Sequence, residues 1–400
     1  MMRRIVIDQL RPGMYVVDLH KPWLEHGLWL TRFPVRDWAQ IRRLIDAGFA
    51  EISIDTRRGR DIDLPVTRLP AAPPPLPLRQ VVRPPATVSL GEERRRAGRL
   101  LGDACRQLDE LARAARAGER VDALALEAVV GKLIESVARN PDALVPLARI
   151  KRPETYDAGH AVATAALTVA LARQQQVAAP ELEKMALGAL LKDIGLAAID
   201  EGLVSKQGQL SQAEYAIVQS HVEEGLAVLE ATVSLPETTV AVILEHHERY
   251  NGGGYPYCMA GDDITLAGRI AAVVDAYDAM TSDRPYRAAL APTAALRQLY
   301  EQGGVQFDPA LVAGLVHALG VYPVGTLVLL ESGHLAVVEQ GTPGDPLRPV
   351  VNVIYHAGRR QYVEPVRADL SRKIGNHYGR ILRAESFERW GLSPLRWQPA

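Results

Sequence analysis

Residues 92–322 carry an almost continuous series of amphipathic helical patterns, and this feature restricts the chain to a mainly α fold. In the first pattern, Leu101, Cys105, Leu108 and Ala112 recur every three or four residues and so share one helix face. Each helix must bury its apolar face against a neighbour, which favours a helical bundle. The predicted helices lie at about 121–139, 154–175, 179–194, 211–231, 235–250, 264–281, 291–302 and 308–319.

Shorter patterns flank the helical region. Residues 5–7, 15–17 and 51–55 read as strands and residues 38–45 as a helix, which together predict a small α+β domain. The segment 62–90 holds eight prolines, which favours an extended spacer, with docking to a partner's aromatic groove as the weaker alternative.

The region after the bundle changes to strand patterns. A hairpin is predicted from 325–330 and 334–338 around Ser332-Gly333, followed by a strand at 350–354 and a polar tail behind about residue 370. The chain thus divides into an N-terminal domain, a linker, a helical domain and a β-rich appendage with a tail, at 1–61, 62–90, 91–323 and 324–400.

Composition limits the classes of function. The net charge of −1 gives no global attraction to a nucleic-acid polymer or to a membrane surface. Two cysteines far apart in the sequence do not suggest a disulfide framework. The N-terminus lacks the apolar region of a signal peptide, and no apolar run reaches the roughly 18 residues of a membrane span. We therefore expect a cytoplasmic protein without a membrane span.

Residues 246–256 join two histidines and a glutamate to a glycine-rich turn, in the order His-His-Glu-Arg-Tyr-Asn-Gly-Gly-Gly-Tyr-Pro. Neutral imidazoles bind borderline transition metals, and consecutive glycines allow close approach of the backbone. Any single histidine could be an ordinary core or surface residue, but Asp275 follows an apolar run, and a buried carboxylate needs a partner. The candidate metal ligands are His160, Asp193, His221, His246, His247 and Asp275.

In this order, and with Gly254-Tyr255-Pro256 after them, these residues resemble the HD-GYP family of bacterial cyclic di-GMP phosphodiesterases, over about residues 150–320. Residues 8–16 and 54–56 resemble the small domain of unknown function that precedes some members. The resemblance implies one or two divalent transition metals per chain, such as Fe or Mn. One metal would be held by His160, Asp193 and Asp275, and the other by Asp193, His221, His246 and His247.

The chain departs from the family motif Leu-His-Asp-Ile-Gly-Lys, since residues 191–196 read Leu-Lys-Asp-Ile-Gly-Leu. Lys192 replaces a histidine ligand, and Leu196 replaces a lysine that can contact phosphate. A protonated lysine offers no lone pair and repels a dication. Two outcomes are open: the ammonium of Lys192 replaces the charge of the first metal, or the side chain turns to solvent and leaves a weak site.

Substrate contacts are also implied by the resemblance. Arg284 and Arg287 suit recognition of phosphate or guanine by their forked guanidinium groups. Asp278 lies three residues after Asp275 on the same helix face and joins Asp193 as a candidate catalytic carboxylate. Gly254, Tyr255 and Pro256 would form a loop beside the substrate, which is also a candidate surface for a signalling partner protein.

Three functions follow from this pattern. The favoured one is metal-dependent hydrolysis of cyclic di-GMP to pGpG or GMP in second-messenger signalling, with activity reduced by Lys192 and Leu196. The second is a cyclic di-GMP receptor or protein-interaction scaffold without turnover. The third, disfavoured by the Gly-Tyr-Pro sequence, is a phosphohydrolase for other nucleotides. The sequence leaves the oligomeric state open, with a homodimer among the options.

Overall fold

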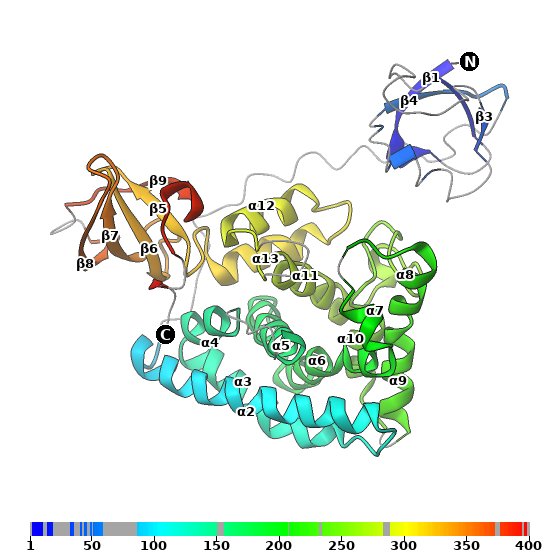
Figure 1. Ribbon diagram of the computed structural model, residues 1–400, viewed down its shortest axis with the longest axis horizontal. Coiled ribbons are helices and arrows are strands. Elements are labelled where there is room, and N and C mark those ends of the chain that lie inside the picture. Colours follow the sequence, from blue (N-terminus) through cyan, green and yellow to red (C-terminus); the bar gives the residue numbers. More distant parts are fainter. Residues whose placement is uncertain are drawn as a thin grey trace. The chain divides into compact units, whose positions relative to one another are not determined.

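A computed structural model gives the architecture of the chain in two compact units, Met1–Ala72 and Pro73–Ala400 (Figure 1). It describes residues 2–10, 14–18, 33–35, 41, 44–45, 49, 51–58, 86–149, 156–206, 208–231, 234–282, 289–372, 377–393 and 396–397. Most of the helix predicted at 38–45 and the linker residues 62–85 lie outside these ranges. The domain boundaries at residues 61 and 90 stay a prediction.

The N-terminal unit contains an antiparallel four-stranded sheet of order β1-β4-β2-β3. In chain order its strands are β1 (Met2–Val6), β2 (Tyr15–Asp18), β3 (Phe33–Pro34) and β4 (Glu51–Asp55). Ile5 of β1 lies opposite Ile52 of β4, and both are buried together with Ile54, Leu10 and Val16. Alternation along β4 therefore sends its isoleucines into a small core, as the pattern at 51–55 predicts.

The helical bundle begins with α2 (Leu90–Arg116), where the Ser89 hydroxyl accepts a hydrogen bond from the Glu92 backbone N–H at 3.3 Å. Such a cap satisfies one of the free N–H groups of the first turn. Ala97, Leu100, Ala104 and Leu108 are buried at three- or four-residue spacing along α2. This apolar stripe packs on the rest of the bundle, as the periodicity predicts.

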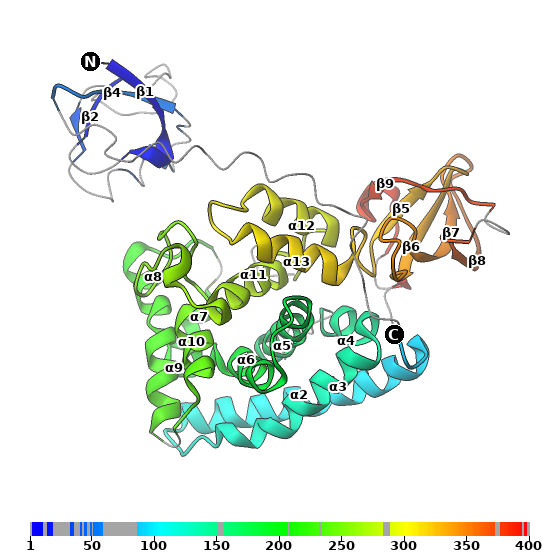
Figure 2. The ribbon, with the colours of Figure 1, turned by 180° about the vertical axis from the view of Figure 1, so that it is seen from behind.

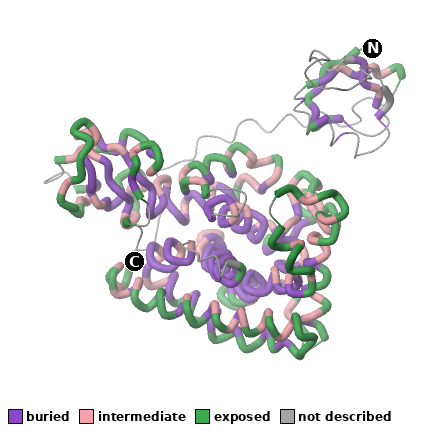
Figure 3. The backbone as a smooth tube through the Cα atoms, viewed as in Figure 1, coloured by how far each residue is buried: buried purple, intermediate pink, exposed green. Residues whose placement is uncertain are grey.

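Helix α5 (Tyr156–Gln174) lies at the centre of the bundle, and nearly every residue from Ala158 to Ala172 is buried (Figure 3). Its neighbours are α2, α3 (Glu127–Arg139), α4 (Pro141–Ala148), α6 (Ala179–Leu191), α11 (Leu266–Met280) and α13 (Pro309–Leu319). Many of its buried residues are alanines, which let these helices approach closely. A polar side chain on α5, such as His160, must therefore find its partners inside the bundle.

Several helices end earlier than their sequence patterns. The predicted helix at 179–194 stops at Leu191, and that at 235–250 is α10 (Glu237–Glu245). The pattern at 211–231 forms two helices, α8 (Gln212–Gln219) and α9 (His221–Glu230), which meet at Ser220. Short α7 (Glu201–Val204) precedes them, and α12 (Pro292–Glu301) forms where predicted. These early ends place several candidate ligands at helix termini rather than within helices.

The C-terminal sheet is antiparallel, with the order β8-β7-β6-β5-β9 (Figure 2). Strands β5 (Leu327–Leu330), β6 (His334–Gln340) and β7 (Val350–His356) confirm the predicted hairpin and third strand. Two further strands, β8 (Gln361–Asp369) and β9 (Ile381–Glu385), complete it, and β9 lies in the segment predicted as a polar tail. Both were missed because most of their side chains are exposed or half-buried and give no apolar alternation.

The sheet contacts the bundle through polar groups. The backbone N–H of Gly341 donates to Asp142 Oδ2 at 2.9 Å, and Arg94 Nη2 donates to the Glu339 carbonyl at 3.3 Å. Asp142 lies in α4, one of the helices beside α5.

The helices and strands described above confirm the predicted mainly α class, with small sheets before and after the bundle.

Candidate metal centre

The candidate ligands come together at the ends of helices in the middle of the bundle. His160 and Asp275 lie within α5 and α11, whereas the others flank helix termini. Lys192 and Asp193 follow α6, His221 is the first residue of α9, and His246 and His247 follow α10. Five separate segments therefore supply side chains to one place.

Gly195 explains how Asp193 reaches the histidines. The chain leaves α6 and enters a short 3₁₀ helix, Ile194–Ala198, that lies directly against α9. A Cβ added at Gly195 would lie 2.0 Å from the His221 carbonyl oxygen and 2.4 Å from the Gly225 nitrogen. Only glycine permits this approach, which holds Asp193 beside His221.

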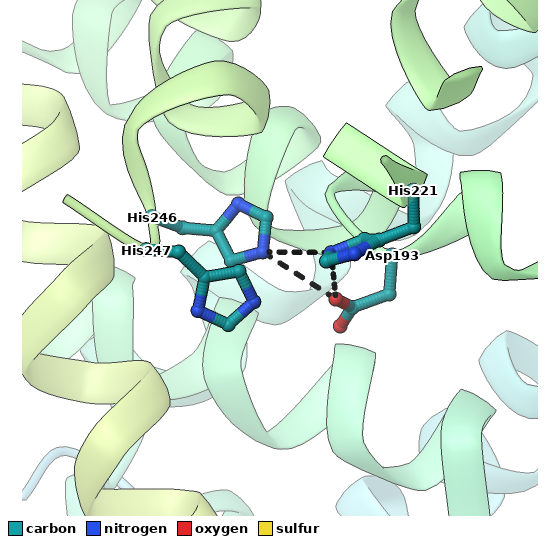
Figure 4. Close-up of side chains that lie close together, drawn as sticks. All are labelled: Asp193, His221, His246 and His247. Atoms are coloured by element: carbon teal, nitrogen blue, oxygen red, sulfur yellow. Dashed lines mark hydrogen bonds and ion pairs between the residues drawn. The ribbon is translucent and has the colours of Figure 1, made fainter. Parts of the chain in front are cut away.

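Asp193, His221, His246 and His247 form a cluster in which each residue offers a ligand atom within 4.8 Å of the others (Figure 4). Asp193 Oδ1 lies 3.5 Å from His246 Nε2 and 3.7 Å from His221 Nε2. The two Nε2 atoms are 3.4 Å apart. These four residues are called the histidine cluster below.

The histidine cluster fits a cation better than it fits direct hydrogen bonding. His221 Nδ1 lies 2.7 Å from the Val218 carbonyl oxygen, and His246 Nδ1 lies 2.8 Å from that of Ile243. A carbonyl accepts only, so each Nδ1 carries the proton and each Nε2 presents a lone pair to the cluster. Two lone pairs and a carboxylate oxygen then face one another, an arrangement that a divalent metal would stabilise.

Burial keeps the imidazoles of His221 and His247 neutral. Burial, followed by the neighbouring His246, lowers the pKa of His221 to about 4. The same two causes hold the pKa of His247 well below its ordinary value of 6.5. Metal binding requires an unprotonated imidazole nitrogen, so at neutral pH these two histidines are already in the binding form.

The second group, His160, Asp193 and Asp275, also offers ligand atoms within 4.8 Å of one another, but Lys192 lies among them. Lys192 is 1% exposed, and its Nζ lies 2.7 Å from Asp275 Oδ1 and 3.0 Å from His160 Nε2. The ammonium also donates to Asp193 Oδ2. Of the two outcomes considered for Lys192, a side chain turned to solvent is therefore wrong.

The ammonium controls the charge of its neighbours. Burial alone would raise the pKa values of Asp193 and Asp275, but the positive charge of Lys192 outweighs it and holds both well below 3.8. Conversely, burial would lower the pKa of Lys192, and the two carboxylates raise it above 10.5. The three groups thus form a buried, ionised set.

Both ring nitrogens of His160 contact carboxylates. Its Nδ1 lies 2.6 Å from Asp278 Oδ2, and its Nε2 lies 3.0 Å from Asp275 Oδ1. Burial and Lys192 oppose protonation, yet hydrogen bonds to Asp275 and Asp278 raise the pKa of His160. Asp278 is 1% exposed. It lies behind His160, on the far side of the imidazole from the histidine cluster.

The Gly-Tyr-Pro loop closes over the histidine cluster. The ring of Tyr255 stacks on His247, with ring centroids 4.6 Å apart, and Tyr215 of α8 meets Tyr255 edge-on at 6.3 Å. A Cβ at Gly254 would lie 2.4 Å from Glu248 Cα, so this position requires glycine. Pro256 follows in the same loop. That the loop binds substrate stays a prediction.

Two residues that contact this loop, Glu248 and Tyr215, were not predicted from the sequence. Glu248 is fully buried, and its carboxylate accepts the backbone N–H groups of Tyr257 at 2.8 Å and Met259 at 3.0 Å. Tyr215 lies 40 positions before Tyr255 in the sequence and carried no signal. The sequence feature that could have indicated Glu248 is its position, directly after His246 and His247 and shortly before three glycines. Arg284 and Arg287 lie outside the described residues.

Known proteins share both parts of this architecture. The HD domain family matches residues 133–311, and the Domain of unknown function DUF3391 matches residues 2–126. The second match runs past the proline-rich segment and through α2. In the part of the chain that the structure describes, no helix is long and apolar enough to cross a bilayer.

Curated relatives match different lengths of the chain. Cyclic di-GMP phosphodiesterase PA4108 of Pseudomonas aeruginosa is 36% identical over 397 residues, covering 99% of this chain and 95% of the relative. The cyclic di-GMP phosphodiesterase response regulator RpfG of Xanthomonas campestris is 36% identical over 147 residues, covering 36% of this chain and 39% of that protein. The 3'3'-cGAMP-specific phosphodiesterase 3 of Vibrio cholerae is 34% identical over 168 residues, covering 42% of this chain and 36% of that protein.

A helical bundle with histidines and aspartates gathered at its helix ends defines this chain as an HD-domain protein. With the Gly-Tyr-Pro loop and the DUF3391 domain before the bundle, it belongs to the HD-GYP family. The predicted resemblance to this family is therefore confirmed.

Proposed function

We propose that this protein is a metal-dependent phosphodiesterase that hydrolyses cyclic di-GMP to pGpG or GMP. The histidine cluster carries the proposal: two Nε2 lone pairs, the Asp193 carboxylate and neutral His247 gather within 4.8 Å. Relatives named cyclic di-GMP phosphodiesterases support the substrate. Imidazole and carboxylate ligands suit Fe(II) or Mn(II).

The residues divide into those that hold the metal and those that shape its surroundings. Asp193, His221, His246 and His247 would hold the ion, which supplies Lewis acidity toward a phosphoryl oxygen and a more acidic water. Asp278 keeps His160 in one orientation through the contact at 2.6 Å. We expect the substrate to be oriented by Arg284 and Arg287 and by the loop at Tyr255.

A cyclic di-GMP receptor without turnover is the second candidate. One observation favours it: Lys192 Nζ lies where the family pattern has a histidine ligand, within 3.0 Å of His160 Nε2. Leu196 also removes the lysine that can contact phosphate in the family. Neither Lys192 nor Leu196 is one of the four residues of the histidine cluster, so we favour the enzyme.

The deciding experiment is a hydrolysis assay on protein loaded anaerobically with Fe(II) or with Mn(II). Cyclic di-GMP and 3'3'-cGAMP are supplied separately, because relatives act on each by name, and products are separated by ion-exchange chromatography. We expect pGpG or GMP from cyclic di-GMP, and no products from His246→Ala. Binding of cyclic di-GMP by the loaded wild type without products would establish the receptor instead.

Specificity needs a matched control. His356→Ala alters a histidine of β7, in the C-terminal sheet, and leaves the histidine cluster intact. It should hydrolyse cyclic di-GMP as fast as the wild type. Faster hydrolysis of 3'3'-cGAMP than of cyclic di-GMP would assign the chain to the other substrate.

A further inference from the structure

The ammonium of Lys192 lies at the centre of the second candidate metal group. Its Nζ is 2.7 Å from Asp275 Oδ1 and 3.0 Å from His160 Nε2, and it donates to Asp193 Oδ2. His160, Asp193 and Asp275 are the residues whose ligand atoms gather within 4.8 Å. The ammonium thus touches every member of the group.

A metal ion at the same place would meet two obstacles. An ammonium and a dication within hydrogen-bond distance of the same carboxylates repel each other strongly in a buried site. The lysine side chain is also buried, since it is 1% exposed and lies at the end of α6. Moving the ammonium away would break its contacts with Asp193, Asp275 and His160.

Asp193 connects this place with the histidine cluster. Its Oδ2 accepts from Lys192, whereas its Oδ1 lies 3.5 Å from His246 Nε2 and 3.7 Å from His221 Nε2. One carboxylate therefore joins the ammonium on one side to the imidazoles of His221 and His246 on the other. The contact of Lys192 with Oδ2 leaves Oδ1 as the oxygen of Asp193 that faces His221 and His246.

We infer that Lys192 is a built-in second cation, so that the centre holds a single metal ion, at the histidine cluster. His160 and Asp275 then hold the ammonium instead of a metal, and Lys192 acts as a positioning residue through Asp193. The inference rests on the proposed metal binding by the histidine cluster, but not on turnover of any substrate. It replaces the two-metal arrangement implied by the family resemblance.

The test counts and characterises the metal directly. Wild-type protein and Lys192→His are loaded anaerobically with excess Mn(II) and desalted. Manganese per chain is then measured by mass spectrometry, and its environment by electron paramagnetic resonance. We expect about one manganese in the wild type, with the hyperfine pattern of an isolated ion. Lys192→His restores a ligand and removes the charge, so about two should bind, with an exchange-coupled spectrum.

Lys184→Met is the matched control, since Lys184 is a partly exposed lysine of α6, the helix that Lys192 follows, and it pairs with Glu181. It should behave as the wild type. An exchange-coupled pair in the wild type would overturn the inference, as would Lys192→His that is folded by circular dichroism yet holds only one manganese. One isolated manganese in the wild type without hydrolysis would refute the proposed phosphodiesterase and leave the inference about Lys192 standing. A manganese pair in the wild type with hydrolysis would refute the inference about Lys192 and support the phosphodiesterase.

Discussion

The ring of Tyr255 lies stacked on the imidazole of His247, with ring centroids 4.6 Å apart and planes inclined by 26°. This contact links the loop of the family signature to a candidate metal ligand. Groups that orient a ligand contribute to metal affinity although they do not touch the ion. Tyr255→Ala should therefore weaken metal binding by about tenfold, measured by competition with a chelator.

Two variants separate the stacking from other effects. Tyr255→Phe keeps the ring and should keep the affinity of the wild type. Tyr257→Ala removes a neighbouring tyrosine that is 53% exposed, and should change nothing. An equal loss in Tyr255→Phe and Tyr255→Ala would show that the hydroxyl, and not the stacked ring, matters.

His246 and His247 should be indispensable for metal binding. Replacing both with alanine removes two of the four ligands of the histidine cluster, so purified protein should contain no transition metal by elemental analysis. The double-alanine variant should still fold, with the helical circular dichroism of the wild type. Retention of a stoichiometric metal in this variant would place the metal elsewhere in the chain.

Metal-free protein should lose stability as pH falls from 6.5 to about 4. Burial, together with His246, lowers the pKa of His221 to about 4 in the folded chain, whereas the unfolded chain titrates near 6.5. In that window the unfolded state binds a proton that the folded state does not, so acid favours unfolding by about 1.4 kcal/mol for each pH unit.

Urea denaturation at several pH values measures this slope. His221→Gln cannot titrate, so its free energy of unfolding should depend less steeply on pH over the same window. The same slope in His221→Gln and in the wild type would mean that other groups dominate the acid sensitivity.

A buried ion pair at the start of the bundle should matter for stability. Glu93 of α2 is fully buried and accepts from Ser136 Oγ at 2.7 Å and from Arg139 Nε at 2.7 Å. Glu93→Ala leaves Ser136 Oγ without its acceptor, while Arg139 keeps Glu135 at 3.2 Å, so the free energy of unfolding should fall by about 2 kcal/mol. Glu92→Ala, at the neighbouring half-buried position, should lower it by less than about 1 kcal/mol. Equal losses would contradict a special role for Glu93.

Much of the centre could be predicted from the sequence. The order of His160, Asp193, His221, His246, His247 and Asp275 was sufficient to propose one site, and the structure brings their ligand atoms together in two overlapping groups. That they bind metal stays a prediction. The mainly α class followed from apolar periodicity, because the bundle helices bury regular stripes such as that of α2.

Other features depend on contacts between distant segments. The early end of α6 at Leu191 is fixed by the packing of Gly195 on α9, which no local pattern reveals. The orientation of Lys192 depends on Asp275, 83 positions away in the sequence. Helix α5 shows little amphipathic pattern because it is buried on nearly every side. Strand β9 pairs with β5 while exposing much of its own surface, so it resembled a polar tail.

The most direct test of the account is a titration of metal-free protein with Mn(II), during which hydrolysis of cyclic di-GMP is followed at each step. Because the histidine cluster would hold the metal and Lys192 already supplies the second cation, the rate should rise linearly and stop rising at about one equivalent per chain. A rate that appears only with a second equivalent would contradict the single-metal centre. No hydrolysis at any equivalent, under Mn(II) or anaerobic Fe(II), would contradict the proposed phosphodiesterase.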